Sequence, residues 1–192
     1  MQLIDMPETY LTISAPQQGL YKEKGSKFLA FAFPVESIDE VSTLLAEHRK
    51  EYYDARHVCY AYMLGADRLL FRANDDGEPS GTAGRPILGQ INSFNLTNIL
   101  IIVVRYFGGI LLGTGGLIQA YKQAAADAIT NADIVERDVM VPKTLRFPYE
   151  KTTAVMRTIK DTQSKILSQD FDNATGECII NLSVKKHYES RF

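Results

Sequence analysis

One run of the sequence constrains the fold more than any other. Residues 98–105 read Asn-Ile-Leu-Ile-Ile-Val-Val-Arg, in which Ile99 to Val104 are six consecutive apolar residues. β-Branched residues favour strands, and a strand that lacks polar alternation is buried on both faces. The run therefore predicts a strand inside a sheet that is covered on both sides. A membrane span, by contrast, needs about 20 apolar residues.

Periodicity and capping signals predict further elements around this strand. Ser37-Ile-Asp-Glu40 has the pattern of a capping box, in which the serine and the glutamate bond each other's free amides, and apolar residues then recur at helical spacing. The predicted elements are strands at 19–21, 27–35, 57–64, 69–72 and 133–140, helices at 38–52, 85–91 and 115–132, a loop at 74–84 and a turn at 106–113. We expect a mixed sheet packed by the helices at 38–52 and 115–130.

The charge of the chain changes sign near Pro142. Residues 1–142 carry a net charge of -5, whereas residues 143–192 carry +3. After Pro142 the predicted order is strand 144–149, helix 153–162, strands 165–171 and 177–184, and the start of another helix after Lys185. This β-α-β-β-α order is that of a ferredoxin-like domain lacking its last strand. We expect two α+β domains, 1–138 and 142–192. The chain is either naturally short or truncated at Phe192, and the unpaired position in the sheet favours truncation.

Composition excludes several classes of protein. Hydrophobic residues make up 45% of the 192 residues and charged residues 23%, as in an ordinary globular chain. The net charge of -2 excludes a polycation that binds nucleic acid by bulk charge. Cys59 and Cys178 form no C-x-x-C, zinc or disulfide pattern, so a reducing compartment is expected. The opening Met1–Asp5 carries an acid where a signal peptide is basic. We expect a soluble, cytoplasmic protein without a membrane segment, metal or cofactor.

Nine of the thirteen glycines lie within forty residues, from Gly77 to Gly116. The first part of this cluster, 75–86, holds the carboxylates Asp75, Asp76 and Glu78. Its acids could hold a hard cation, or its hydroxyls and amides an anion, although a solvated turn has the same composition. The order of residues fits neither a calcium loop nor G-x-S-x-G.

The second part of the cluster follows the buried strand. Arg105 ends the strand, Gly115-Gly116 open a helix, and Lys122 follows in that helix. Free amides at a helix N-terminus form an anion site, which Arg105 could complete, but the same glycines would also permit tight packing. The segment is neither a P-loop nor a G-x-G-x-x-G motif. We interpret the three histidines, among them His57, as structural residues. No serine or cysteine lies near a His-Asp pair in the sequence, so we expect no catalytic residues.

The two segments together resemble the YigZ/IMPACT family. The resemblance rests on 75–86, Asp-Asp-Gly-Glu-Pro-Ser-Gly-Thr-Ala-Gly-Arg-Pro, and on 104–117, whose core is Arg-Tyr-Phe-Gly-Gly followed by Leu-Gly. It covers most of 17–138. It implies a βαβ first domain with a left-handed crossover, as in elongation factor G domain IV, a small-subunit ribosomal protein domain and the GHMP kinases. The tail is similar to the last domain of elongation factor G.

The resemblance also bears on function. Eukaryotic members carry an N-terminal domain that binds the activator of a translation kinase; this chain starts in the family core, so that partnership does not transfer. We expect a non-enzymatic protein, bound to nucleic acid or the ribosome, that acts near translation. The alternative is an enzyme that binds a small phosphorylated ligand or nucleotide as GHMP kinases do, although 117–120 lacks their serine-rich continuation. A protein-interaction regulator is a third interpretation.

We predict that the two segments meet at one cleft. Arg85, Arg105, Gly115, Gly116 and Lys122 are the candidate residues for binding an anion or nucleic acid. Asp75, Asp76 and Glu78 are expected at the rim, where they pair with the arginines or exclude other anions. If the arginines only made ion pairs with these carboxylates, the cluster would be a packing device.

Overall fold

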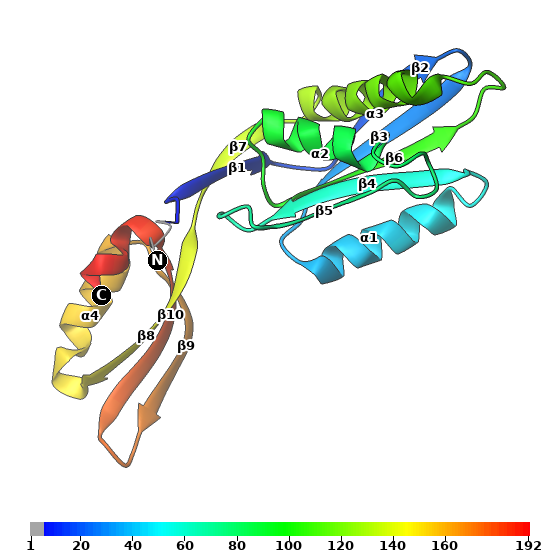
Figure 1. The fold of residues 1–192 in the computed structure, drawn as a ribbon. Coiled ribbons are helices and arrows are strands. Elements are labelled where there is room, and N and C mark those ends of the chain that lie inside the picture. Colours follow the sequence, from blue (N-terminus) through cyan, green and yellow to red (C-terminus); the bar gives the residue numbers. More distant parts are fainter. Residues whose placement is uncertain (1–5) are drawn as a thin grey trace. The chain divides into compact units, whose positions relative to one another are not determined.

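The structure is a computed structural model that describes residues 6–192 and divides into two compact units. The large unit is Tyr10–Arg137, and the small unit is Asp138–Phe192 with the described residues before Tyr10. The acidic Met1–Asp5 segment noted above lies outside the described residues. Each unit has its own sheet (Figure 1).

The large unit is built on a five-stranded sheet with the order β2-β3-β6-β4-β5. The strands are β2 (Gln17–Glu23), β3 (Ser26–Pro34), β4 (His57–Leu64), β5 (Leu70–Asn74) and β6 (Ile99–Tyr106). Every neighbouring pair is antiparallel, so the prediction of a mixed sheet was wrong. The sequence pattern misled because β3 and β4, which flank the helix α1 (Ile38–Glu51), run the same way, but β6 inserts between them.

Helices cover both faces of this sheet. On one face α1 packs over a core that includes Phe31, Tyr60 and Ile102. On the other face, α2 (Gly84–Ser93) and α3 (Gly113–Thr130) pack over Phe28, Cys59 and other residues of the same strands (Figure 1). Ile99 to Arg105 of β6 are all buried, which confirms the prediction from their unbroken apolar run.

The N-terminus of α1 shows half of the predicted capping box. The Ser37 hydroxyl accepts a hydrogen bond from the Glu40 amide at 3.2 Å. The Glu40 carboxylate, however, accepts from the amide of Glu36 at 2.6 Å rather than from that of Ser37. The cap therefore extends one residue further back than the sequence predicted.

A strand that the sequence analysis missed, β1 (Thr9–Ile13), pairs with β7 (Ile134–Asp138) in a two-stranded sheet. The small unit is a sheet of β8 (Met140–Pro148), β9 (Lys165–Asp172) and β10 (Glu177–Lys185) in the order β8-β10-β9, all antiparallel. The 3-10 turn η1 (Tyr149–Lys151) leads into α4 (Thr152–Asp161).

The small unit has a core of its own, formed by Phe147, Ile159, Ile180, Leu182 and Val184. The helix predicted after Lys185 is the 3-10 helix η2 (Lys186–Arg191) rather than an α-helix. Within the described part of the chain, no helix combines the length and hydropathy that a membrane crossing requires.

Candidate binding site

The candidate site begins with a row of three residues across the sheet. Arg105, near the end of β6, lies opposite Phe28 on β3 and opposite His57 on β4. Residues that face each other across antiparallel strands project from the same face. All three therefore lie on the face covered by α2 and α3. The Arg105 guanidinium carbon lies 5.5 Å from the ring centre of Phe28.

Glu78, from the glycine-rich loop, holds this row in place. Its side chain is only 3% exposed, and its Oε1 accepts hydrogen bonds from Arg105 Nη1 and from the Tyr121 hydroxyl, each at 2.7 Å. A buried carboxylate is costly unless it is paired and hydrogen-bonded. Glu78 meets both conditions, so it fixes Arg105 in one orientation.

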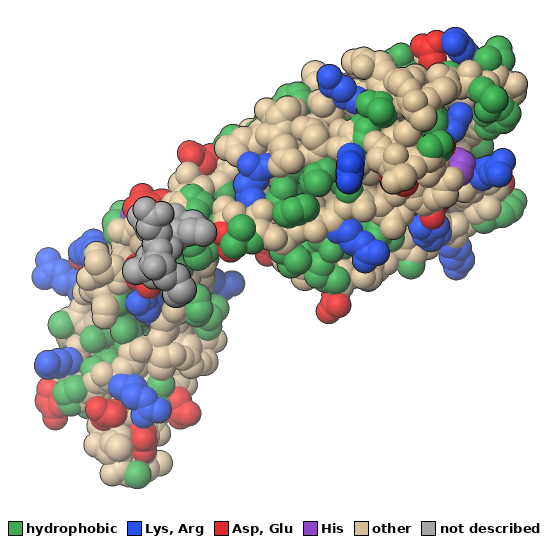
Figure 2. All heavy atoms as spheres, in the orientation of Figure 1, with side chains coloured by type: hydrophobic (Ala, Val, Ile, Leu, Met, Phe, Trp, Pro, Cys, Tyr) green, Lys and Arg blue, Asp and Glu red, His purple; other side chains and the backbone are tan. Residues whose placement is uncertain are grey.

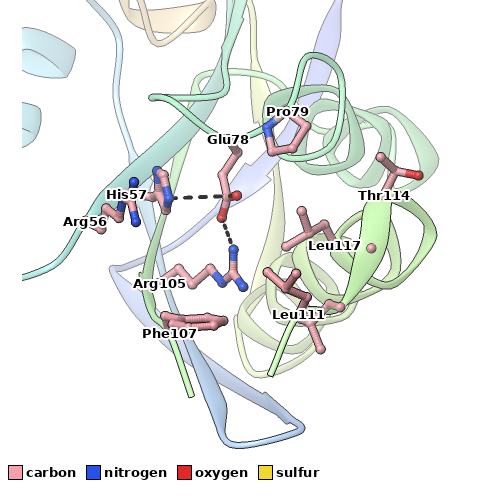
Figure 3. A pocket seen from close by; sticks show the side chains of 11 residues that line it. Arg56, His57, Glu78, Pro79, Arg105, Phe107, Leu111, Thr114 and Leu117 are labelled. Atoms are coloured by element: carbon pink, nitrogen blue, oxygen red, sulfur yellow. Dashed lines mark hydrogen bonds and ion pairs between the residues drawn. The ribbon is translucent and has the colours of Figure 1, made fainter. Parts of the chain in front are cut away.

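His57 lies on the other side of the Glu78 carboxylate. Its Nδ1 is 2.8 Å from the carbonyl oxygen of Asp76, which can only accept, so Nδ1 carries the hydrogen. Its Nε2 lies 3.8 Å from Glu78 Oε2 and faces it (Figure 3). The buried Cys59 thiol donates a hydrogen bond to the carbonyl oxygen of Asp75 at 3.0 Å. Burial raises the pKa of this thiol and the pKa of the Tyr121 hydroxyl.

His57, Glu78 and Arg105 line a pocket of about 370 Å³. Its lining residues are Arg56, His57, Glu78, Pro79, Arg105, Phe107, Leu111, Leu112, Gly113, Thr114 and Leu117. The charged groups lie on one side, and Leu111, Thr114 and Leu117 on the other (Figure 3). Gly113 and Thr114 line the pocket and begin α3, whose N-terminus has no side-chain cap, so its first amides have no helical partners.

The acids beside Glu78 have different tasks. The Asp75 carboxylate accepts from the amides of Gly81, Ala83 and Gly84 at 2.8–3.0 Å and so closes the loop onto the start of α2. Burial alone would raise the pKa of Asp75, but these amides outweigh it and lower that pKa below its usual value. Asp75 is therefore the residue that shapes the loop.

Asp76 joins the loop to the sheet and to α1. Its carboxylate accepts from the amide of Val58 at 2.7 Å and forms a bidentate pair with Arg49. Burial would raise the pKa of Asp76, but the Arg49 and Val58 hydrogen bonds lower it. The two aspartates position the loop, while Glu78 alone of the three acids lines the pocket.

The structure brings only some of the predicted site residues together. Glu78 and Arg105 meet in the pocket, but Glu78 is buried on its wall rather than at an exposed rim. The other predicted binding residues do not line the pocket; these are the exposed Arg85, Gly115 and Lys122, and the half-buried Gly116. We therefore propose no contact of these four residues with a ligand in the pocket.

Sequence reasoning missed Arg56, Phe107 and the pocket role of His57. The signal for His57 was its place at the start of a strand, which becomes informative only once β4 is paired with β6. Phe107 is 53% exposed, and its ring centre lies 5.6 Å from the Arg105 guanidinium carbon. Among residues 6–192 no group of three His, Cys, Asp or Glu side chains is placed to hold a metal ion.

The comparisons with known proteins identify the family of this chain. The family model of the Impact N-terminal domain matches residues 24–129, which contain every residue of the pocket. The chain belongs to the IMPACT family. The IMPACT family member YigZ of Escherichia coli is 33% identical over 166 residues, which is 85% of this chain and 81% of that protein.

A second IMPACT family member, from Haemophilus influenzae, is 36% identical over 167 residues, with 84% of this chain and 79% of that protein covered. A solved structure described as that of a hypothetical protein superposes with a TM-score of 0.79 at 29% identity, over 96% of this chain and 89% of the other. The IMPACT family assignment expected from residues 75–86 and 104–117 is thus confirmed, and the fold is mixed α and β with antiparallel sheets.

Proposed function

We propose that this IMPACT family protein is a non-enzymatic binding protein that acts in translation and contacts RNA or the ribosome through its large unit. Family membership supports the link to translation, since the family resemblance implies such a role for eukaryotic members. We also propose that the folds of the two units resemble domains IV and V of elongation factor G. The alternative is that the large unit binds a protein and no RNA, and the test below distinguishes the two.

One observation carries the RNA-binding part of the proposal. Arg56 and Arg105 open on the same pocket as the uncapped N-terminus of α3. The single carboxylate there, Glu78, already accepts from Arg105 and Tyr121. The arrangement therefore leaves a local surplus of positive charge and amide donors, which suits a phosphate group.

The contact should be local rather than a broad electrostatic surface. Figure 2 shows Lys and Arg scattered among apolar and acidic side chains on the visible face, without one large basic patch. The whole chain carries a net charge of -2. Binding that depends on a few phosphate contacts is strengthened by low salt, and its salt dependence measures how many contacts there are.

Filter binding to a structured RNA at low and moderate salt tests the proposal. Arg56→Gln removes one positive charge from the pocket, and Lys122→Gln removes one from an exposed position of α3 outside it. We expect Arg56→Gln to weaken binding and to reduce the salt slope by about 0.7–0.9, the effect of one phosphate contact, and Lys122→Gln to change neither. Absence of RNA binding at low salt, or equal effects of the two variants, would exclude the pocket as an RNA contact.

A second candidate function is an enzyme that acts on a small phosphorylated ligand. The observation that favours it is the size of the pocket, about 370 Å³, which suits a small molecule, with Gly113 and Thr114 at the helix entry. The segment from Gly113 to Leu117 contains no lysine that could bind the phosphates of a nucleoside triphosphate, which argues against kinase chemistry. A nucleotide-dependent rise in melting temperature that requires magnesium would favour the enzyme.

A further inference from the structure

Arg105 uses only part of its hydrogen-bonding capacity. Its Nη1 donates to Glu78 Oε1 at 2.7 Å. Its Nε is buried and has no hydrogen-bond partner, and no residue within 6–192 accepts from Nη2. In the planar guanidinium, Nε and Nη2 point their hydrogens along the same edge. This edge is the one that binds two oxygens of a carboxylate or phosphate side by side.

An unpaired buried donor calls for an explanation, because it has lost its hydrogen bonds to water without gaining one from the protein. The side chain of Arg105 is 7% exposed and belongs to the pocket lining. Glu78 holds one end of the guanidinium, and Phe28 and Phe107 lie against it. The free edge is thereby held in a fixed direction, which is how a pre-organised oxyanion receptor is built.

The other donors of the pocket favour phosphate over carboxylate. Gly113 and Thr114 bring the free amides at the start of α3 to the pocket lining, and Arg56 contributes a second guanidinium. A planar carboxylate satisfies two of these donors, whereas a phosphate monoester offers three terminal oxygens and nearly two negative charges. The number and spread of donors therefore match a terminal phosphate.

The rest of the pocket is apolar. Pro79, Phe107, Leu111 and Leu117 form its walls, and Phe107 and Leu111 are 53% and 83% exposed. An exposed ring beside an arginine is a surface on which a nucleic-acid base stacks. A pocket of about 370 Å³ leaves room for a phosphate and one ring system together.

We propose that the pocket binds a nucleotide that carries a terminal phosphate monoester, with the phosphate on the Nε–Nη2 edge of Arg105 and the N-terminus of α3, and the base against Phe107. This deepens the proposed function and rests on it where the nucleotide is the end of an RNA chain. A free nucleoside monophosphate has the same chemistry. Since Nε is closed off from solvent, Nη2 is the donor that the phosphate meets first.

The test compares ligands that differ only in the phosphate. One short single-stranded RNA is prepared with a 5′-phosphate, a 3′-phosphate or neither, and adenosine monophosphate is compared with adenosine. We expect the phosphate to increase the affinity of at least one RNA end and of the nucleoside by about tenfold or more. In ¹⁵N–¹H spectra the Arg105 Nε–H resonance should shift on addition of adenosine monophosphate.

The variants locate the site. Arg105→Lys keeps the charge and removes the bidentate edge, so it should abolish the preference for phosphate. Arg56→Gln, at an exposed residue, should reduce the preference without a cost in folding, and Lys122→Gln should leave it unchanged.

The two proposals fail in different ways. Equal binding of phosphorylated and unphosphorylated ligands would overturn the nucleotide site while leaving RNA binding intact. Arg105-dependent binding of adenosine monophosphate without any RNA binding would support the site and exclude the proposed function. If Arg56→Gln and Lys122→Gln had the same effect, the phosphate would lie elsewhere.

Discussion

Replacement of Gly108 by alanine is the sharpest test of how the loop after β6 is held. A Cβ at this position would lie 2.0 Å from the carbonyl carbon of Gly25 and 2.3 Å from the Ser26 nitrogen. Both are backbone atoms of the β2–β3 turn, so no side chain can move aside. The amide of Gly108 also donates to the Ser26 hydroxyl at 3.1 Å, a bond that the displaced backbone would lose.

The expected cost follows from these contacts. Overpacking costs about 1–3 kcal/mol and a lost hydrogen bond about 1 kcal/mol. We therefore expect Gly108→Ala to destabilise the large unit by about 2–4 kcal/mol and to lower its melting temperature by about 5–15 °C in differential scanning calorimetry. Because the turn of Gly25 positions the residues that follow β6, phosphate binding should weaken as well.

Gly115→Ala is the matched control in the same glycine cluster. A Cβ at Gly115 would meet nothing within 4 Å, and the residue lies in α3. Alanine favours a helix over glycine by up to about 1 kcal/mol, so this variant should be as stable as the wild type or more stable. A melting temperature for Gly108→Ala within about 1 °C of the wild type, or an equal loss in both variants, would refute the close approach of the two turns.

Three further predictions concern ionisable groups. Asp75→Asn should cost about 1–3 kcal/mol in urea denaturation at neutral pH; since the folded-state pKa of Asp75 is lowered, the difference from the wild type should shrink as pH falls below the unfolded pKa of about 3.9. A thiol reagent should label the half-buried Cys178 of the native protein first and reach Cys59 only after denaturation, because burial raises the pKa of Cys59. Ultraviolet titration should show that the hydrogen bond to Asp54 raises the pKa of Tyr106 to about 12, and Asp54→Asn should return it toward 10.0.

The sequence predicts those features of the fold that depend on neighbouring residues. The buried run of β6 and the Ser37 cap of α1 are examples, since each is set by side chains a few positions apart. β1 was missed although Thr9–Ile13 contains β-branched and aromatic residues, because a five-residue strand at the start of a unit has no turn signal in front of it. The antiparallel sheet was also missed, because it depends on β6 inserting between β3 and β4.

The site was predicted in part for the same reason. Arg105 was found from its place at the end of a buried strand. Glu78 was expected at the rim of the site, where it could pair with an arginine, but its burial was not predicted because its partners Arg105 and Tyr121 lie 27 and 43 residues away. Gly115 and Gly116 were favoured as amide donors, whereas the pocket is lined by Gly113 and Thr114, two residues earlier. A shift of two residues at a helix start is beyond what capping signals resolve.

The row of Phe28, Arg105 and His57 across the sheet has a consequence for how this site can change in evolution. Each of the three residues lies on the face covered by α2 and α3 only while β3, β6 and β4 keep their present register. An insertion or deletion of one residue in any of these strands would turn its member of the row to the α1 face and break up the site. New ligand preferences can therefore arise by substitution within the row, or by changes in the length of the loop between Phe107 and Leu112, where no register has to be kept.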